Sequence, residues 1–252
     1  MSGAKSPAPV VVLPAALGRL LGVLRRLTAS DMPAIAVIGG MAVNIRLSTA
    51  DEAHRATLDI DIVADDAAPT ALAVLSRGHH LTGNDTVVVD GVEVDIIETY
   101  AVSEHDLEGL GDDAKLFIVG HRWALDTAGL VGITAFGRGG PRVDVRVATA
   151  AGLVATKSHA AGYPRAARRA NKHGGDLYDL FRLIEAFDRR GELRSDLAAA
   201  PGGLGKLVAQ VVEAEILANP ARALRQMSPV AATVLEVGRI GDVAEPFVAA
   251  LR

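Results

Sequence analysis

The sequence predicts an α+β protein, with a mixed α/β region at residues 14–149 and a helical region at residues 150–252. Three short segments of the first region alternate apolar and polar residues, which is the period-two pattern of half-buried strands. From residue 150 onward, apolar residues instead recur at helical spacing. Glycine and proline interrupt that pattern at three places, which are Gly174-Gly175, Pro201-Gly202-Gly203 and Pro220.

The first elements of the mixed region follow a short N-terminal segment. Residues 1–13 are rich in Ser, Pro and Ala, and we expect a loose tail there. Leucines at helical spacing over residues 17–27, with arginines between them, predict an amphipathic helix. A short apolar run at residues 34–38 predicts a strand that leads into Gly39-Gly40, and a helix is expected over residues 41–47.

The three alternating segments come next. Residues 57–63 place Asp59 and Asp61 on one side of a strand and isoleucines on the other. A helix is expected at residues 68–77. Residues 87–89 and 92–97 predict a hairpin, because Asp90-Gly91 between them is a typical two-residue turn. The third segment predicts a strand at residues 143–147, whereas residues 101–140 carry no single pattern.

Composition excludes several classes of protein. The net charge is -4 and the pI is near 6.0, so extended coating of duplex nucleic acid is disfavoured and any such contact must be a local patch. The absence of cysteine excludes disulfides, cysteine-zinc sites and thiol catalysis. No apolar run is long enough to span a membrane. Pro9 and Pro14 break the apolar stretch near the start, which disfavours a signal peptide, and we expect a cytoplasmic monomer.

Three carboxylates and a glycine turn form the strongest functional pattern. Asp59 and Asp61 share one side of a strand, and Asp95 lies between Val94 and Ile96 on another. Asp is disfavoured in strands, so its presence there needs a reason. Three carboxylates can hold two Mg²⁺ ions, which favour oxygen ligands and assist in-line phosphoryl displacement. Gly39-Gly40 at a helix N-terminus can approach phosphates closely.

These motifs resemble the DNA polymerase β-type nucleotidyltransferase superfamily, and within it the AbiEii/MenT-like toxins. The resemblance covers about residues 34–185 and implies a mixed sheet flanked by helices, followed by a helical domain that completes the active site. One sequence departure is Gly174-Gly175, where family members tend to carry a basic residue. The matching segments are Val37-Ile-Gly-Gly-Met-Ala-Val, Arg55-Ala-Thr-Leu-Asp-Ile-Asp-Ile, Leu153-Val-Ala-Thr-Lys and Asp176-Leu-Tyr-Asp-Leu.

The resemblance also implies residue roles. Asp59, Asp61 and Asp95 would hold two Mg²⁺ ions, with Mn²⁺ as an alternative, and Asp95 would help deprotonate the acceptor hydroxyl. Lys157 would reach a nucleotide phosphate, with Asp176 or Asp179 orienting it or the base. The remaining nucleotide-binding candidates face the triphosphate or neutralise its oxygens, and they are Gly39, Gly40, Arg46 and Arg55.

Two further groups of side chains leave alternatives open. One is a basic cluster, which is either a patch for the phosphates of an RNA acceptor or a solvated helix face. The other is a set of histidines, at His79-His80 and His159, for which zinc is disfavoured because His79-His80 has no ligand at helical spacing. Trp123 is expected in the core. The basic cluster comprises Arg165, Arg168, Arg169, Lys172 and His173.

The expected function is therefore metal-dependent transfer of NMP from an NTP to an acceptor hydroxyl. The resemblance implies the 3′ end of tRNA as acceptor, the toxin role of a toxin–antitoxin system, and a cognate antitoxin. A protein side chain or a small molecule is an alternative acceptor with the same chemistry. A decayed nucleotide-binding module and a sugar-nucleotide glycosyltransferase using Asp59-Ile-Asp61 are further alternatives.

Overall fold

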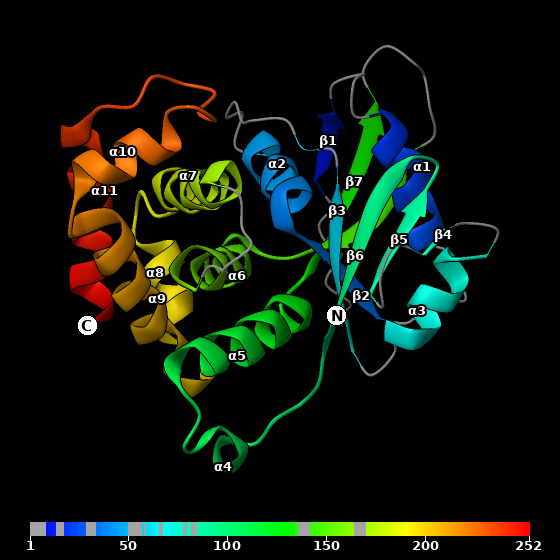
Figure 1. Cartoon of the computed structure of the whole chain (residues 1–252), viewed down its shortest axis with the longest axis horizontal. Coiled ribbons are helices and arrows are strands. Elements are labelled where there is room, and N and C mark those ends of the chain that lie inside the picture. Colours follow the sequence, from blue (N-terminus) through cyan, green and yellow to red (C-terminus); the bar gives the residue numbers. More distant parts are fainter. Residues whose placement is uncertain are drawn as a thin grey trace, which may run out of the picture.

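The computed structural model describes the chain over residues 9–13, 18–28, 34–49, 57, 59–65, 68–77, 80–81, 85–135, 142–163 and 170–252. Within these ranges a twisted sheet occupies one half of the molecule and a group of helices the other (Figure 1). The mixed sheet flanked by helices and the helical C-terminal part are both as expected from the sequence. None of the helices in these ranges is long and apolar enough to cross a bilayer.

Eight strands make up the sheet in the described part of the chain, in the order β1-β7-β8-β2-β3-β6-β5-β4. β3 runs parallel to β6 and antiparallel to β2, so the sheet is mixed. All four residues of β2 are buried, as in a strand covered on both faces. The strands are β1 (Val10–Leu13), β2 (Ile35–Ile38), β3 (Ile60–Asp65), β4 (His80–Leu81), β5 (Thr86–Val89), β6 (Val92–Thr99), β7 (Gly129–Ala135) and β8 (Val143–Val147).

The helices separate into those beside the sheet and those in the second half (Figure 1). α1 and α3 lie beside the sheet, and α6 and α7 run through the helical half. Short 3₁₀ and π-helical turns at Pro201–Gly203 and Glu213–Leu217 flank α9. The helices are α1 (Gly18–Leu27), α2 (Gly39–Thr49), α3 (Ala68–Leu75), α4 (Glu104–Leu107), α5 (Asp112–Asp126), α6 (Ala150–Gly162), α7 (Ala170–Phe187), α8 (Glu192–Ala198), α9 (Leu204–Val212), α10 (Pro220–Met227) and α11 (Val237–Leu251).

Close packing of α5 on α6 joins the two halves of the sequence. A Cβ built on Gly152 of α6 would lie 2.9 Å from the Cα of Ala124 on α5, so only glycine allows this approach. α5 precedes residue 149 in the chain but belongs by packing with the helices that follow it. The division of the sequence at residue 149 stays a prediction. The group of helices on one side of the cleft includes α5, which comes before that residue.

Three elements differ from the sequence expectations. Val10–Leu13 form the edge strand β1, which pairs in parallel with β7, so the expectation of a loose tail is wrong for these residues. β3 begins at Ile60, and Asp59 directly precedes the strand. Residues 101–140, which carried no single pattern, contain the long helix α5 and strand β7. The hairpin of β5 and β6 with its turn at Asp90-Gly91 is confirmed.

Candidate active site

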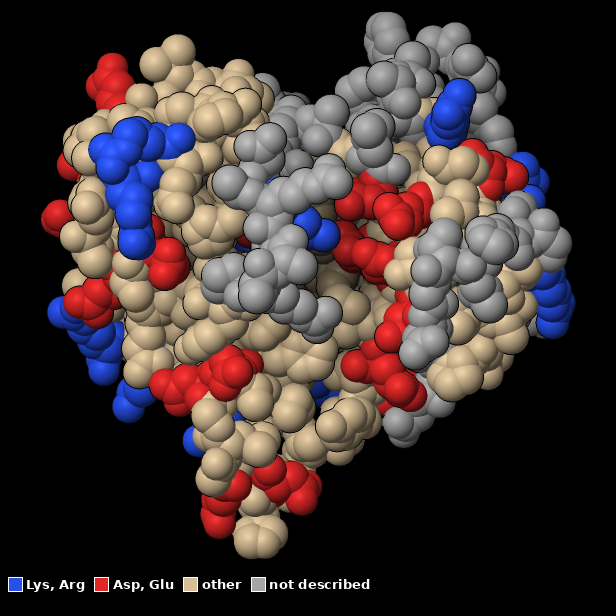
Figure 2. Space-filling view, in the orientation of Figure 1, with Lys and Arg blue, Asp and Glu red and all other residues tan. Residues whose placement is uncertain are grey.

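A cleft of about 930 Å³ separates the sheet from helices α5, α6 and α7. In the space-filling view, acidic side chains gather on the sheet side of the central hollow (Figure 2). Six carboxylates and two lysines are among the described residues that line the cleft. The lining is therefore strongly acidic, which favours a ligand that brings its own cations.

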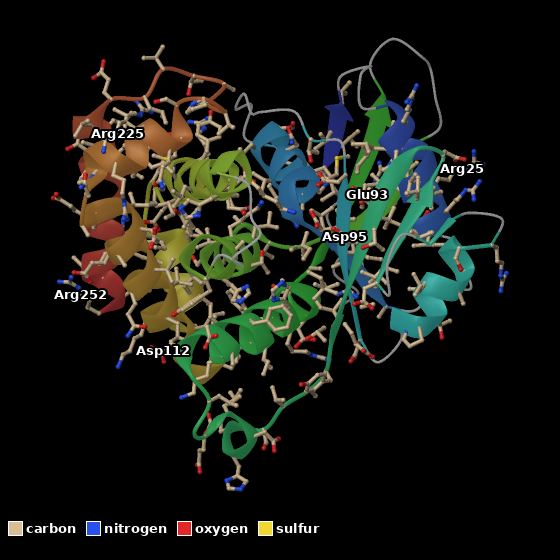
Figure 3. The ribbon with its side chains drawn as sticks, viewed as in Figure 1. Arg25, Glu93, Asp95, Asp112, Arg225 and Arg252 are labelled. Carbon is tan, nitrogen blue, oxygen red and sulfur yellow. The ribbon has the colours of Figure 1, made fainter. Side chains whose placement is uncertain are left out.

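The sheet register brings two of the predicted carboxylates together. Asp61 of β3 and Asp95 of β6 are Cα partners in parallel pairing, so their side chains leave the same face of adjacent strands. Asp59 lies two residues before Asp61 and faces the same cleft. Asp95 lies on β6 at the border between the sheet and the helical half (Figure 3). The structure thus assembles the three-carboxylate wall that the sequence predicts.

Two threonines hold the outer carboxylates. Thr57 Oγ1 donates a hydrogen bond of 2.6 Å to Asp59 Oδ1, and Thr86 Oγ1 donates one of 2.6 Å to Asp95 Oδ1. Thr86 lies opposite Asp95 across the β5–β6 hairpin. Sequence analysis missed Thr86 as a site residue. The signal was available, because a two-residue turn at Asp90-Gly91 fixes the hairpin register.

Gly39 places the Asp61 carboxylate at the start of α2. The glycine adopts a left-handed φ of +65°, and a Cβ on it would lie 1.8 Å from Asp61 Oδ2. Any side chain at this position would displace the carboxylate. Gly40 also lines the cleft, as expected for the glycine turn.

The raised pKa of Asp61 shows that there is little positive charge near this carboxylate on the sheet side of the cleft. The pKa of Asp61 is raised to about 6, mainly by burial and then by repulsion from Asp59 and Asp95. Lys157 and Lys172 act in the opposite direction but do not offset it. A bound cation would favour the ionised form of this carboxylate.

The donor chemistry of this wall fits Mg²⁺, although the geometry is not that of a finished metal site. Carboxylate oxygens are the hard ligands that Mg²⁺ prefers. In the described part of the chain, no three acidic or histidine side chains are close enough to coordinate one ion. One oxygen each of Asp59 and Asp95 is bound to a threonine hydroxyl instead. Metal binding would therefore require the three carboxylates to come closer together.

A buried ion-pair group forms part of the opposite wall. Lys157 Nζ of α6 lies 2.9 Å from Asp176 Oδ1 and 2.6 Å from Asp179 Oδ2, both on α7. Burial lowers the pKa of Lys157, but Asp179 and then Asp176 outweigh it, so the net shift is upward and the lysine is charged. Lys157 and Asp176 line the cleft, while Asp179 is fully buried behind them.

Four rings continue the helical wall beyond Lys157, and we call Phe117, His121, His159 and Tyr163 the ring cluster. The centroids of Phe117 and His121 on α5 are 4.5 Å apart, and His159 of α6 lies 5.1 Å from Phe117. Tyr163 stacks on His159 with centroids 6.0 Å apart. All four rings line the cleft, and sequence analysis assigned a site role to none of them.

His121 is held as a neutral ring. Its Nδ1 lies 2.7 Å from the carbonyl oxygen of Phe117, which can only accept, so Nδ1 donates and Nε2 is left as an acceptor. The pKa of His121 is lowered to about 4, mainly by burial and also by repulsion from His159, and these two causes outweigh the hydrogen bond to Phe117. His121 therefore brings no positive charge to this wall.

Arg46 lies outside the cleft. Its guanidinium donates hydrogen bonds of 2.7 Å and 2.6 Å to the carbonyl oxygens of Ala148 and Val147, at the end of β8. The guanidinium is thus occupied by the backbone and does not reach the cleft, so the predicted phosphate contact does not fit this geometry. Trp123 packs against the core, as expected.

The basic cluster is described only in part. Lys172 is exposed and lines the cleft, and His173 lies 3.9 Å from Glu215. Gly174 meets α10 closely, since a Cβ there would lie 2.2 Å from the carbonyl oxygen of Gln226, which explains a glycine in this place. The remaining predicted residues lie outside the described residues, and they are Arg55, His79, Arg165, Arg168 and Arg169.

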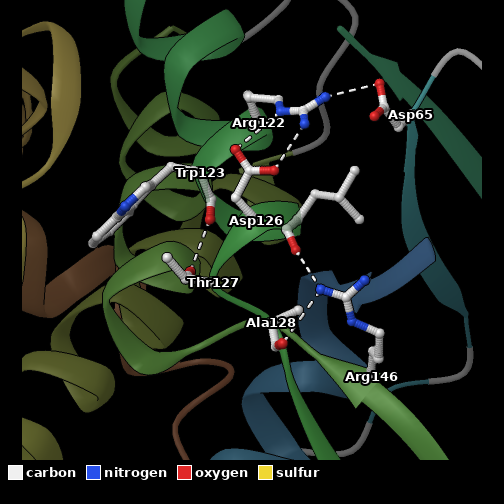
Figure 4. A network of polar contacts seen from close by, with 8 residues as sticks. Asp65, Arg122, Trp123, Asp126, Thr127, Ala128 and Arg146 are labelled. Atoms are coloured by element: carbon white, nitrogen blue, oxygen red, sulfur yellow. Dashed lines mark hydrogen bonds and ion pairs between the residues drawn. The ribbon is translucent and has the colours of Figure 1, made fainter. Parts of the chain in front are cut away.

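A polar network fixes α5 relative to the sheet (Figure 4). Arg122 lies between two carboxylates, with Nη1 2.8 Å from Asp65 at the end of β3 and Nη2 2.9 Å from Asp126. Arg146 of β8 donates a 3.0 Å hydrogen bond to the carbonyl oxygen of Leu125. The network ties the helix that carries Phe117 and His121 to the strand that carries Asp61.

Comparison with known protein families identifies the family of this chain. The family described as "Nucleotidyl transferase AbiEii toxin, Type IV TA system" matches residues 22–227. That span includes every described residue that lines the cleft, on the sheet and on the helices. No curated protein matches the chain. Because the family match covers most of the chain, this protein belongs to the AbiEii nucleotidyl transferase toxins of type IV toxin–antitoxin systems.

Proposed function

We propose that this protein transfers NMP from an NTP to the 3′-terminal hydroxyl of tRNA, using two Mg²⁺ ions, with Mn²⁺ as an alternative. One observation carries the proposal. Asp61 and Asp95 are paired across parallel strands, with Asp61 against Gly39, and the wall faces Lys157 across one cleft. Family membership adds the nucleotidyl transferase class and the toxin role.

The reaction that fits this arrangement is an in-line displacement at phosphorus. The acceptor oxygen forms a bond to the α-phosphorus, the bond from that phosphorus to the bridging oxygen breaks, and pyrophosphate leaves. The proton of the acceptor hydroxyl passes to a carboxylate oxygen of Asp95. Bound Mg²⁺ would stabilise charge on the attacking and leaving oxygens. Asp59, Asp61 and Asp95 would hold it.

The residues of this chain then divide the work. Gly39 gives the Asp61 carboxylate its place at the N-terminus of α2, and phosphate oxygens would lie in the cleft beside Gly40. Lys157 supplies a fixed positive charge on the opposite wall, and Asp176 and Asp179 keep it in place. Lys172 at the exposed edge of the cleft can contact an RNA phosphate. The net charge of -4 fits contact with one RNA end rather than a long duplex.

The type IV description supports a cognate antitoxin as biological partner. A toxicity assay addresses this separately from the chemistry. Expression of the chain should halt growth, expression of Asp61→Asn should not, and the antitoxin gene should restore growth. Equal toxicity of the two forms would mean that the toxic effect does not depend on this site.

The decisive experiment incubates the pure protein with each radiolabelled NTP, Mg²⁺ and total tRNA. Label should enter tRNA with one preferred nucleotide, and chelation by EDTA should abolish it. Asp59→Asn and Asp61→Asn should abolish it too. Asp144→Asn, at an exposed position of β8 outside the cleft, is the matched control and should act as the native chain.

Other results of the same experiment redirect the proposal. Label on the protein and none on tRNA would replace the RNA acceptor by a protein side chain. No label, together with no binding of Mg-NTP, would favour a decayed module. Binding of an NDP-sugar without NTP turnover would instead support the glycosyltransferase alternative.

A further inference from the structure

The ring cluster gives the helical wall of the cleft a chemistry that phosphate transfer does not require. Its members come from two helices, with Phe117 and His121 on α5 and His159 on α6, followed by Tyr163 at the end of α6. The close approach of α5 and α6 at Gly152 brings these rings within 6.0 Å of their neighbours. They line the same cleft as the carboxylates.

The rings present faces that suit a flat heteroaromatic ligand. Phe117, His159 and Tyr163 are each partly exposed into the cleft, whereas His121 is buried behind them. Nucleobases stack on aromatic faces without regard to sequence, because every base has a π-face. The Nε2 acceptor of His121 adds a partner for an amino or imino N–H at the edge of a base.

The spacing of residues along α6 separates the ring cluster from Lys157 by about the length of a nucleotide. Thr156, Lys157, His159 and Ala160 line the cleft in succession, and Tyr163 follows at the helix end. At 1.5 Å of rise per residue, Lys157 and Tyr163 are separated by about 9 Å along the helix axis. A nucleotide places its ribose between phosphate and base, so one molecule can reach both ends of this face.

We propose that the ring cluster binds the base of the incoming nucleoside triphosphate by stacking on His159 and Tyr163, with Phe117 and His121 supporting those two rings. This inference rests on the proposed function, and it assigns the base to α5 and α6 while the triphosphate lies against the sheet wall. The terminal base of the RNA acceptor shares the same chemistry. His159 and Tyr163 follow Lys157 along α6 and line the same cleft, which favours the nucleotide.

The test compares two ligands on the full chain by calorimetry, with Mg²⁺ present. One is the NTP preferred in the labelling experiment, and the other is inorganic tripolyphosphate, which has no base. The native chain should bind the NTP more tightly, by on the order of tenfold or more in Kd. This comparison needs no substitution, so it does not depend on the folding of a variant.

Variants then assign the difference to the rings. His159→Leu and Tyr163→Leu should each raise the Kd for the NTP by on the order of tenfold, and leave the Kd for tripolyphosphate as it is. Tyr163→Phe, which keeps the ring, should bind the NTP more tightly than Tyr163→Leu. Tyr100→Leu is the matched control, because Tyr100 is an exposed aromatic residue outside the cleft.

Each contrary result has a distinct meaning. Equal Kd values for NTP and tripolyphosphate on the native chain would overturn the ring assignment and leave the proposed function standing. The same holds if the leucine variants raise KM for tRNA alone, since the rings would then take the acceptor base. If the native chain binds neither ligand, the proposed function fails, and the ring assignment fails with it.

Discussion

The sheet wall and the helical wall of the cleft differ in how their charged side chains are paired. On the helical wall, Lys157 is held between two carboxylates of α7, and the ring cluster is uncharged at His121. On the sheet wall, burial and the neighbouring charges of Asp59 and Asp95 raise the pKa of Asp61. The helices therefore already hold their cation, whereas a bound cation would favour the ionised form of the sheet carboxylates.

The largest expected effect comes from Gly39, where the sheet wall meets α2. Gly39→Ala would place a Cβ 1.8 Å from Asp61 Oδ2 and must push the carboxylate away. A displacement of about 1 Å in a catalytic group can cost on the order of 100-fold in rate, so we expect a loss of at least that order in labelled nucleotide transfer.

Gly91→Ala separates this displacement from backbone strain. Gly91 has a similar left-handed φ of +76°, but a Cβ there meets nothing within 4 Å. It should lower the free energy of unfolding by about 1 kcal/mol and leave the transfer rate per folded molecule as in the native chain. Equal loss of transfer in both variants would mean that φ, and not Asp61, explains the effect.

The second effect tests whether the helical wall is self-contained. Lys157→Met removes the ammonium group that lies 2.9 Å from Asp176 and 2.6 Å from Asp179, and breaking a buried pair in this way costs about 3–5 kcal/mol of unfolding free energy. Urea unfolding measures the loss, with Lys206→Met on the exposed side of α9 as control. Lys157→Met/Asp179→Asn should recover part of the stability. A loss below about 1 kcal/mol would show that this wall, too, is open to solvent.

The third effect is a pH dependence with opposite signs on the two walls. The folded-state pKa of His121 is lowered from 6.5 to about 4, so the stability due to its neutral ring is present above pH 6.5 and is lost as pH falls through about 4. The full amount is up to about 3 kcal/mol. For Asp61, whose pKa is raised from 3.8 to about 6, the contribution is present below 3.8 and is lost as pH rises through about 6.

Unfolding by urea at pH values between 4 and 6.5 isolates the contribution of the helical wall. His121→Phe should lose less stability than the native chain as the pH falls, because no buried imidazole remains to be protonated. His159 is the neighbouring titratable group and is present in both proteins. His105→Phe, on an exposed face of α4, should follow the native pH profile. Parallel profiles for all three proteins would contradict a neutral buried His121.

The same contrast explains what the sequence could predict. The sheet wall follows from local rules: period-two alternation places Asp59 and Asp61 together, and the Asp90-Gly91 turn fixes the hairpin that carries Asp95. Thr86 lies opposite Asp95 in the same hairpin register, so its place in the site could also have been predicted, but it was not. The resemblance supplied Lys157 and its two aspartates, which the structure joins as ion pairs.

The ring cluster and Arg46 lay beyond sequence reasoning for a physical reason. Phe117 and His159 are 42 positions apart in the sequence. They meet because Gly152 lets α6 approach α5 closely at Ala124. This contact belongs to the tertiary packing, and no local pattern in the sequence indicates it. The resemblance implied a phosphate contact for Arg46, but its guanidinium donates to the carbonyl oxygens of Val147 and Ala148 at the end of β8. The edge strand β1 was likewise fixed by pairing with β7, far along the chain.

The smallest expected effect concerns the link between the walls. Arg122→Gln removes the bridge from α5 to Asp65 of β3, and a partly exposed pair of this kind contributes about 1 kcal/mol or less to stability. The bridge ties the helix that carries Phe117 and His121 to the strand that carries Asp61. We therefore expect a few-fold fall in kcat/KM for NTP, measured on fully folded protein so that lost stability does not contribute to it. Arg142→Gln is the control, because Arg142 pairs with Asp144 close by in the same part of the chain. If Arg122→Gln lowers kcat/KM no more than Arg142→Gln does, the walls keep their spacing without Arg122, and the packing of α5 on α6 is enough to hold the ring cluster in place.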